Sequence, residues 1–365
     1  MMSDSTTSPR SQNRGICVIM AGGRGTRFWP LSRTDRPKQL QALASGQSLL
    51  RETYERVAPL VGPERVLVIT SGNLAEATRN ELPELPASHV ITEPVGRNTA
   101  PCAVLGLGVA ARLAPGVPVA LLPADHFIPD EDRFRDQLAA AFELAAASAT
   151  VVTIGIPPDK PETGYGYLET EDTSGATRQG VRFVEKPDLA TAETYVRGGR
   201  HFWNSGIFVW NPDHFAAMAE AHLPAVVEMM APAIESFGTD GFAEALEVAY
   251  SDCPADSIDF AIMEKLSGFT VLPACFRWSD LGAWDAWGEL AADLDGTNRG
   301  QADLLAVDSR DNVIRVTDRM VALIGVHDMI VVDTEDALLV CRKADAQRIK
   351  EVITKLEERG REDLL

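Results

Sequence analysis

The stretch that decides the fold is GICVIMAGGRGTRFWPLSRTDRPKQL, residues 15–40. Residues 16–20 are apolar and rich in β-branched side chains, which predicts a buried strand. Gly22, Gly23 and Gly25 follow directly. Glycines allow positive φ and let backbone N–H groups approach an anion without a Cβ in the way. A strand that runs into such a loop predicts a phosphate-binding site.

A local excess of cations follows the glycine loop, in the order Arg24, Arg27, Arg33, Arg36 and Lys38. The chain as a whole is acidic, with 34 Lys plus Arg against 53 Asp plus Glu and a formal net charge of -19. Nonspecific nucleic-acid binding is therefore not expected, because no global basic field exists to neutralise phosphates. A small anionic substrate would need a local cationic pocket, and this stretch can supply one.

Two familiar glycine motifs do not fit the loop. A dinucleotide fingerprint needs a third Gly where Arg27 stands, and Pro30 follows at once. A P-loop needs Gly-Lys-Ser/Thr, and no such triplet follows. Taken alone, the loop could be a glycine-rich turn with a solvated basic flank. The whole stretch, however, resembles the signature of the sugar-nucleotide pyrophosphorylases, and PLSRTDRPKQ resembles their mannose-1-phosphate guanylyltransferase branch.

Strands and helices alternate after the loop, which predicts an α/β fold with a mostly parallel sheet covered on both faces. The helices are expected at residues 48–60, 100–113 and 132–147. The strands are expected at residues 65–70, 89–92, 117–122 and 151–156. The resemblance implies a Rossmann-like, GT-A-like nucleotidyltransferase fold with a mixed, mostly parallel sheet.

The segment ITEPVGRNTAP, residues 91–101, offers an acceptor in Glu93, donors in Arg97, an amide in Asn98 and a hydroxyl in Thr99. It follows a predicted strand, where α/β folds bind ligands. A turn with a helix N-cap would use Asn98 and Thr99 equally well. The resemblance assigns nucleotide binding to Ala21, Gly22, Gly23, Gly25, Thr26, Glu93, Arg97, Asn98 and Thr99.

Two aspartates are candidate metal ligands. LLPADHF, residues 121–127, carries Asp125 and His126 to the end of a predicted strand, and Asp280 stands between aromatic residues in FRWSDLGAWDAW, residues 276–287. Carboxylate oxygens suit Mg²⁺. An N-cap for Asp125 and an ordinary turn for Asp280 are the alternatives, and caps are commoner than metal ligands. The resemblance makes both aspartates ligands of Mg²⁺ or another divalent metal. His126 is expected to support the site, because a lone histidine beside a site is more often a hydrogen-bond partner than a catalyst.

Three later motifs suggest a sugar site. Tyr165 and Tyr167 flank Gly166, VRFVEKP brings Glu185 and Lys186 to a strand end, and FWNSGIFVW holds Asn204. A carboxylate and an amide can bind hydroxyls, and an ammonium can meet a phosphate. A hairpin loop with core tyrosines is the alternative for the first motif. The resemblance assigns the sugar to Gly166, Glu185 and Asn204, and its phosphate to Lys186.

The predicted domains are a polar, disordered tail at residues 1–14, a nucleotidyltransferase domain at 15–295 and a C-terminal unit at 300–365. The main domain divides into a nucleotide half at about 15–150 and a sugar half at about 151–295, where residues 212–237 and 257–265 are expected as packing helices. The C-terminal unit combines short apolar runs with a charged helix at 344–359, which indicates a small all-β unit. The resemblance implies a left-handed β-helix, often used in subunit contacts, and hence a homodimer.

The cysteine spacing and the apolar runs add little evidence about the function or location of the protein. The five cysteines are scattered, and no apolar run has the length of a membrane span or the form of a signal peptide. We therefore predict a cytoplasmic protein without membrane partners. Some relatives carry an appended phosphomannose isomerase half, and this chain ends before any such half, so a monofunctional enzyme is expected.

The resemblance implies that GTP and mannose 1-phosphate react to give GDP-mannose and pyrophosphate, with Arg27 and Lys38 as catalytic cations. Three alternatives stay open. One is the same chemistry with another base or sugar, such as ADP-glucose or another GDP-hexose. The second is a non-catalytic regulator of the same fold that binds sugar nucleotides. The third, an NAD-binding enzyme, is disfavoured by Arg27 and Pro30 in the loop.

Overall fold

The computed structural model describes residues 15–171, 174–266 and 268–365, so the predicted tail at residues 1–14 lies outside the described residues. The chain forms two compact units, each assembled from separate segments. Unit 1 consists of the described residues up to Gly22 together with Thr53–Ala124 and Ile128–Trp278; unit 2 consists of Gly23–Glu52, Asp125–Phe127 and Ser279–Leu365. The domain boundaries predicted along the chain stay a prediction.

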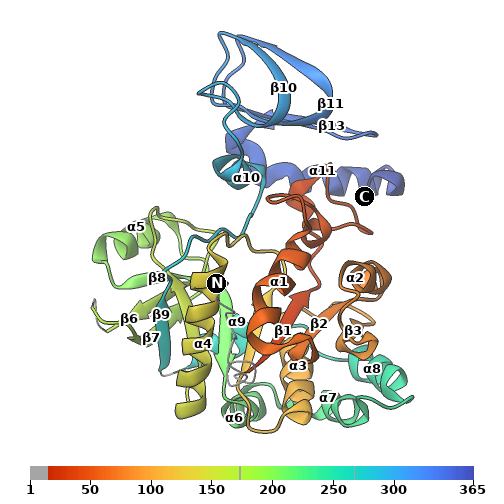
Figure 1. The fold of residues 1–365 in the computed structure, drawn as a ribbon, viewed down its shortest axis with the longest axis vertical. Coiled ribbons are helices and arrows are strands. Elements are labelled where there is room, and N and C mark those ends of the chain that lie inside the picture. Colours follow the sequence, from red (N-terminus) through yellow and green to blue (C-terminus); the bar gives the residue numbers. More distant parts are fainter. Residues whose placement is uncertain (1–14, 172–173, 267) are drawn as a thin grey trace, which may run out of the picture. The chain divides into compact units, whose positions relative to one another are not determined.

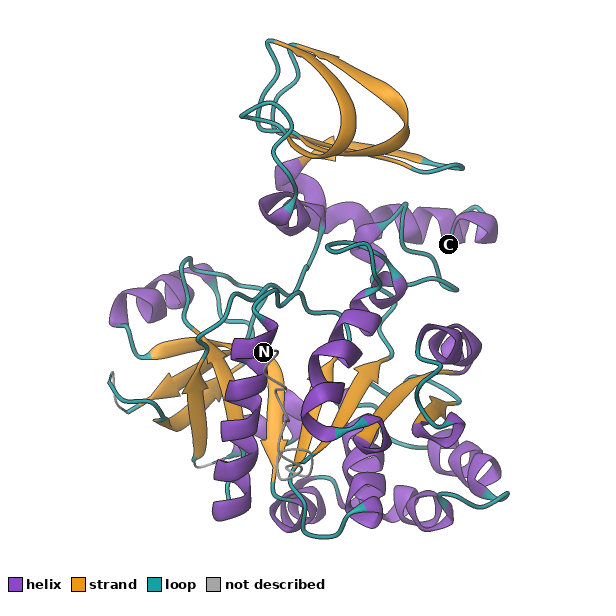
Figure 2. Ribbon diagram, viewed as in Figure 1, coloured by secondary structure: helices purple, strands orange, loops and turns teal. Residues whose placement is uncertain are grey.

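The described strands of unit 1 form one large sheet, which Figure 2 shows flanked by helices. In sheet order the strands are β3 (Val90–Glu93), β2 (Val66–Ser71), β1 (Ile16–Ala21), β4 (Val119–Pro123), β8 (His201–Trp210), β5 (Val152–Ile156), β9 (Phe269–Pro273), β7 (Arg178–Val184) and β6 (Tyr167–Thr170). In Figure 1, β1, β2 and β3 lie together at one end of this sheet, and β6, β7 and β9 lie at the other.

The sheet is mixed, as expected, but only some of its strands pair in parallel. Strands β1 to β4 pair in parallel, as do β5 and β9. Strand β8 runs antiparallel to β4, β5 and β6, and β7 runs antiparallel to β6 and β9. The prediction of mostly parallel strands therefore holds for the nucleotide half and fails for the sugar half, where the hairpin β6–β7 and the long strand β8 reverse the direction.

The parallel strands are buried on both faces, as an α/β fold requires. Residues 16–19 of β1 and 66–69 of β2 are 0% exposed. The helices that contribute to unit 1 are α1 (Leu49–Val61), α2 (Ala75–Glu81), α3 (Thr99–Leu113), α4 (Glu131–Ala147), α5 (Leu189–Gly198), α6 (Pro212–His222), α7 (Pro224–Ser236), α8 (Phe242–Ser251) and α9 (Ile258–Ala261). The helix expected at 212–237 is two helices, because Pro224 begins a new one.

Unit 2 holds the cationic stretch on an aromatic core. This core includes Phe28 and Trp29 from the stretch and Trp284 and Trp287 from α10 (Trp284–Leu290). Trp284 Nε1 donates to the carbonyl of Trp29 over 3.0 Å, and Trp287 Nε1 donates to that of Leu43 over 2.6 Å. The residues after the glycine loop are thus anchored to a helix that begins 255 positions after Trp29.

The C-terminal part of unit 2 is a second sheet followed by α11 (Ile349–Glu358) (Figure 1). Its strands β10 (Arg299–Val307), β11 (Val313–Ile324) and β12 (Met329–Asp333) pair in parallel, and β13 (Leu338–Arg342) closes it antiparallel to β12. Buried Asn298 and Asn312 stack at the turns, since Asn312 Nδ2 donates to Asn298 Oδ1 over 2.9 Å. Parts of NVIRV and MVALIGV, two of the short apolar runs of this unit, lie in the single strand β11.

Candidate active site

Gly25 is the glycine of the loop that close packing requires. Its φ is +58°, in the left-handed region, and a Cβ there would lie 2.3 Å from Lys38 Cβ. A Cβ on Gly23 would meet nothing within 4 Å, and one on Gly22 would lie 3.5 Å from Glu93 Oε2. The loop therefore needs glycine at Gly25 so that its backbone can pass directly over the stem of Lys38.

The three charged residues Lys38, Asp125 and Asp280 meet within unit 2. Lys38 is buried, and its Nζ lies 2.7 Å from Asp125 Oδ2 and also donates to the backbone carbonyl of Asp280. The two aspartate segments lie side by side because Phe127 and Ser279 form an antiparallel bridge, with N···O distances of 2.9 and 3.0 Å. This bridge thus brings both aspartates to one lysine.

The electrostatics keep Asp125 ionised. Burial by itself would raise the pKa of Asp125, but the Lys38 ammonium, helped by His126, lowers it below the ordinary value. Its side chain is still 38% exposed. An ionised, accessible carboxylate beside Asp280 suits Mg²⁺, which typically takes one or two carboxylates together with substrate phosphates. Within the described ranges, no group of three or more His, Cys, Asp or Glu residues could hold a metal by itself.

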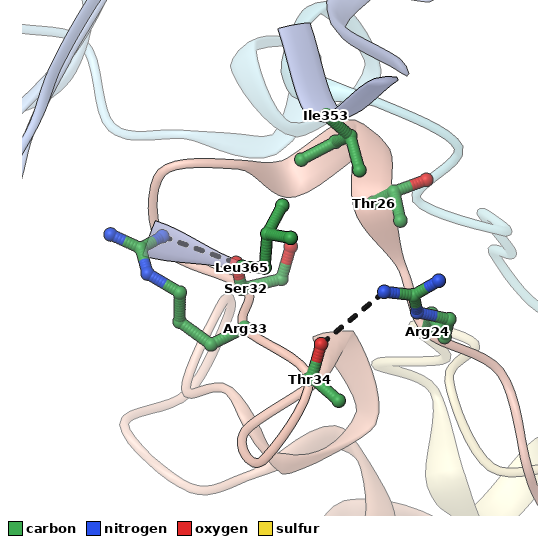
Figure 3. Close-up of a pocket in the computed structure, with 7 residues that line it drawn as sticks. All are labelled: Arg24, Thr26, Ser32, Arg33, Thr34, Ile353 and Leu365. Carbon is green, nitrogen blue, oxygen red and sulfur yellow. Dashed lines mark hydrogen bonds between the residues drawn. The ribbon is translucent and has the colours of Figure 1, made fainter. Parts of the chain in front are cut away.

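The other cations of the stretch have different surroundings. Arg27 is exposed, and its guanidinium donates to Gln347 Oε1 over 2.9 Å. Figure 3 shows Arg24 and Thr26 at a small pocket of unit 2, where Arg24 donates to Thr34 Oγ1 over 3.3 Å. Arg33, also in this pocket, pairs with Asp336 over 2.8 Å. Arg24 and Arg33 thus have structural partners within unit 2, whereas Lys38 faces the candidate metal ligands.

In unit 1, Glu93 is buried and held by a tyrosine. Only 6% of Glu93 is exposed, and Tyr250 Oη donates to its Oε1 over 2.8 Å. Burial raises the pKa of Glu93 to about 7, and the tyrosine hydrogen bond only partly opposes this shift. Arg97 donates to the carbonyls of Tyr250 and Ser251, at 3.2 and 2.6 Å. Arg97 therefore connects the segment of residues 91–101 to the end of α8.

Asn98 and Thr99 begin helix α3. The side chain of Asn98 accepts from the N–H of Thr99 over 2.8 Å, and the φ of Asn98 is +66°. Thr99 Oγ1 accepts from the N–H of Ile258 over 3.0 Å. The structure thus gives Asn98 the N-cap position that is the alternative interpretation of its sequence. The nucleotide-binding role of both residues stays a prediction.

The predicted sugar residues come together in unit 1. A Cβ on Gly166 would lie 2.6 Å from Glu185 Oε2, and the carbonyl of Gly166 accepts from the N–H of Asn204 over 2.8 Å. Lys186 Nζ lies 2.5 Å from Glu185 Oε1, with 61% of the lysine side chain exposed and 10% of the glutamate side chain. The result is a nearly buried acceptor, an amide and an accessible cation in one cluster.

Sequence reasoning missed three residues behind these clusters. Tyr250 holds Glu93, Asp259 accepts from Asn204 Nδ2 over 3.1 Å, and Glu264 accepts from the N–H of Glu185 over 3.2 Å. The last two lie in SIDFAIMEK, where the apolar spacing predicts only a packing helix. Neither acid has a local signal in the sequence, because their hydrogen bonds join segments 55 and 79 positions apart.

Comparisons with known proteins identify the family. The nucleotidyl transferase family matches residues 16–296, and the MannoseP isomerase/GMP-like beta-helix domain matches residues 303–356. The mannose-1-phosphate guanylyltransferase of Escherichia coli (strain K12) is 34% identical in an alignment that covers 97% of this chain and 76% of the relative. The chain belongs to the mannose-1-phosphate guanylyltransferase family.

Two further relatives of this guanylyltransferase-family protein support the family assignment. Xanthan biosynthesis protein XanB of Xanthomonas campestris pv. campestris (strain B100) is 35% identical over 95% of this chain and 74% of its own length. A solved protein of Thermus thermophilus, described as a mannose-1-phosphate geranyltransferase, is 36% identical with a TM-score of 0.85, over 94% of this chain and 99% of the other.

These matches confirm the predicted family, the α/β fold with a C-terminal β-helix unit, and enzyme activity of the nucleotidyltransferase class. The guanylyltransferase-family protein is a sugar-nucleotide pyrophosphorylase. Among its described residues no helix combines the length and the apolar character needed to span a membrane. The roles of individual residues, the metal and the homodimer stay predictions.

Proposed function

We propose that the protein makes GDP-mannose and pyrophosphate from GTP and mannose 1-phosphate. The observation that carries this proposal is the buried Lys38, which holds the Asp125 carboxylate and the Asp280 backbone beneath the glycine loop at Gly25. Two relatives with this chemistry in their names, both from Escherichia coli, match nearly the whole chain. A cation beside two candidate metal ligands suits nucleotidyl transfer, in which phosphate charge must be offset.

The reaction needs no general base. A phosphate oxygen of mannose 1-phosphate is already an anion when it attacks the α-phosphorus of GTP in line, and pyrophosphate leaves. The protein must hold two polyanions together and offset their repulsion, which is catalysis by positioning and electrostatics. Asp125 and Asp280 would hold Mg²⁺, which when bound polarises phosphate oxygens.

The chain's own cations carry out the remaining tasks. Lys38 and the exposed Arg27 would stabilise charge on the triphosphate and on the departing pyrophosphate, and the backbone of residues 22–25 would donate N–H groups to it. Lys38 is already paired with Asp125 before substrate binds. Substrate phosphate would share the ammonium with that carboxylate, so the lysine need not be desolvated anew for each turnover.

The buried acids of unit 1 favour guanine and a hydroxyl-rich sugar. Guanine presents N–H donors on its Watson–Crick edge, and Glu93, with Tyr250 on one oxygen, supplies a carboxylate acceptor. Adenine presents a ring acceptor at the equivalent position, which a carboxylate repels. Glu185 and Asn204 would bind hydroxyls of mannose, and the accessible Lys186 would meet its phosphate.

The test is pyrophosphate release by the purified protein with Mg²⁺, with each of the four nucleoside triphosphates crossed against mannose 1-phosphate, glucose 1-phosphate and N-acetylglucosamine 1-phosphate. We expect the fastest release with GTP and mannose 1-phosphate. Preference for another pair would keep nucleotidyl transfer and overturn the assigned substrates. No release with any pair, together with binding of GDP-mannose, would identify a regulator instead. Light scattering of the same sample tests the homodimer that the family suggests.

A further inference from the structure

The short helix α9 connects the predicted nucleotide and sugar segments of unit 1. The N–H of Ile258, its first residue, donates to Thr99 Oγ1 over 3.0 Å. The next residue, Asp259, accepts from Asn204 Nδ2 over 3.1 Å. Adjacent residues of α9 therefore contact one predicted nucleotide residue and one predicted sugar residue.

The amide of Asn204 has partners at both ends. Its Oδ1 accepts from the N–H of Gly206 over 3.0 Å, while its Nδ2 donates to Asp259. A backbone N–H can only donate and a carboxylate can only accept, so both bonds form in one orientation of the amide and not in the flipped one. Gly206 and Asp259 together orient the amide so that Asn204 offers its second N–H to a ligand, and Asp259 is the side-chain partner of the amide nitrogen.

Glu185 complements this donor with an acceptor. Gly166 is next to both residues, because a Cβ on it would lie 2.6 Å from Glu185 Oε2 and its backbone carbonyl accepts from the backbone N–H of Asn204 over 2.8 Å. The backbone of Glu185 is held in turn by Glu264 Oε1 at 3.2 Å. A fixed donor beside a fixed acceptor matches neighbouring hydroxyls of a sugar ring, each of which both donates and accepts.

We infer that Asp259 is a positioning residue for sugar recognition, which holds the Asn204 amide with its N–H toward a sugar hydroxyl. The inference rests on the proposed function, since the sugar 1-phosphate is the ligand proposed for this cluster. It assigns a role to a residue that the family resemblance left among the packing helices.

The ionisation of Asp259 is compatible with this role. Burial and, next, the charge of Glu185 raise the pKa of Asp259 to about 6, while Lys186 and the Asn204 hydrogen bond lower it. Above that pH the group is a carboxylate, which accepts and cannot donate. The exposed ammonium of Lys186 offsets part of the negative charge that Glu185 and Asp259 place together.

The experiment is a double-mutant cycle on the KM for mannose 1-phosphate, with Asn204→Ala, Asp259→Ala and the double variant. Losing the fixed amide should raise this KM about tenfold, the usual effect of one hydrogen bond. The KM for GTP should change less than about twofold. The double variant should resemble Asn204→Ala alone, because the two residues act as one unit. Asp259→Asn should recover much of the loss, since its amide oxygen can accept from Asn204.

The controls separate this role from general damage. Asp252→Asn changes an exposed aspartate before α9 and should leave both KM values unchanged. If the circular dichroism spectrum of Asp259→Ala differs from that of the wild type, the same cycle is measured with Asp259→Ser instead. An unchanged KM for the sugar phosphate, or additive effects of the two substitutions, would overturn the inference. If the wild type itself releases no pyrophosphate, the proposed function fails first, and the cycle is then measured on GDP-mannose binding by calorimetry.

Discussion

Two acids of unit 1 and one acid of unit 2 have hydrogen-bond partners of different charge. Glu93 and Asp259 in unit 1 are paired with neutral donors, Tyr250 and Asn204, and burial raises the pKa of these acids to about 7 and about 6. Asp125 in unit 2 is paired with the ammonium of Lys38; burial alone would raise the pKa of Asp125, but Lys38 together with His126 lowers it. Neutral partners suit acids that bind uncharged N–H and O–H donors, and a cationic partner suits an acid that works among phosphates and metal ions.

The largest effect should come from removing the ammonium of Lys38 in unit 2. Lys38→Met keeps the aliphatic stem beneath Gly25 and removes the charge, so we expect a normally folded protein that turns over about 10²–10³-fold more slowly, or about 3 kcal/mol in the transition state. Steady-state pyrophosphate release measures this. Lys350→Met, on the exposed surface of α11, is the matched control. Wild-type turnover in Lys38→Met would remove this lysine from the mechanism.

The acids of unit 1 should give the next largest effect, on stability rather than rate. Glu93 has a pKa of about 7 in the folded protein against an ordinary value of 4.5, so the unfolded chain releases its proton first as pH rises. Its stabilising contribution is fully present below pH 4.5 and is lost as pH rises to about 7, which amounts to about 3 kcal/mol.

Urea unfolding of the wild type and of Glu93→Gln across a pH range of about 4.5 to 8 measures this contribution. The unfolding free energy of the wild type should fall relative to that of Glu93→Gln as pH rises. The difference between the two proteins should be flat above about pH 8. Glu55→Gln serves as the control at a half-buried glutamate of α1. A difference that does not vary with pH would mean that Glu93 is not an acid of raised pKa, and the contrast between the two units would be lost.

A smaller effect should follow from crowding the loop over Lys38. Gly25→Ala places a Cβ 2.3 Å from Lys38 Cβ at a φ of +58°, which should cost about 2 kcal/mol of unfolding free energy. Gly23→Ala, where nothing lies within 4 Å, should cost less than about 1 kcal/mol. Chemical denaturation of both variants checks this. Equal losses would show that the close approach at Gly25 has no energetic consequence.

Local patterns in the sequence predicted much of this molecule. The strands β1 to β5 and the helices α1, α3 and α4 lie within about two residues of their predicted positions, because alternation and helical spacing are local signals. The family resemblance implied the grouping of Gly166, Glu185 and Asn204. Gly166 precedes β6 and Glu185 follows β7, whereas Asn204, expected just before a strand, lies within β8.

The missed features depend on contacts between distant segments. The pairing of Trp29 with Trp284, which helps place the cationic stretch in unit 2, has no local signature. The Asn298–Asn312 stack is visible in the sequence only as two asparagines fourteen positions apart, and a β-helix with such short coils has too few repeats to reveal a period. Asp259 was missed because an acid on a short helix ordinarily faces solvent, and its hydrogen bond with Asn204 joins segments 55 positions apart.

The smallest effect should come from removing one neutral donor in unit 1. Tyr250→Phe deletes the hydroxyl that donates to Glu93 Oε1 and leaves the ring in place, so the buried carboxylate loses one hydrogen bond and its pKa rises further. The KM for GTP should increase several-fold, about 1 kcal/mol, while the KM for mannose 1-phosphate stays the same. Tyr195→Phe, which removes a half-buried hydroxyl that accepts from Arg182, is the control. An increase in both KM values would mean that Tyr250 stabilises unit 1 as a whole, whereas an increase for GTP alone would show that a neutral partner is what prepares Glu93 for a base.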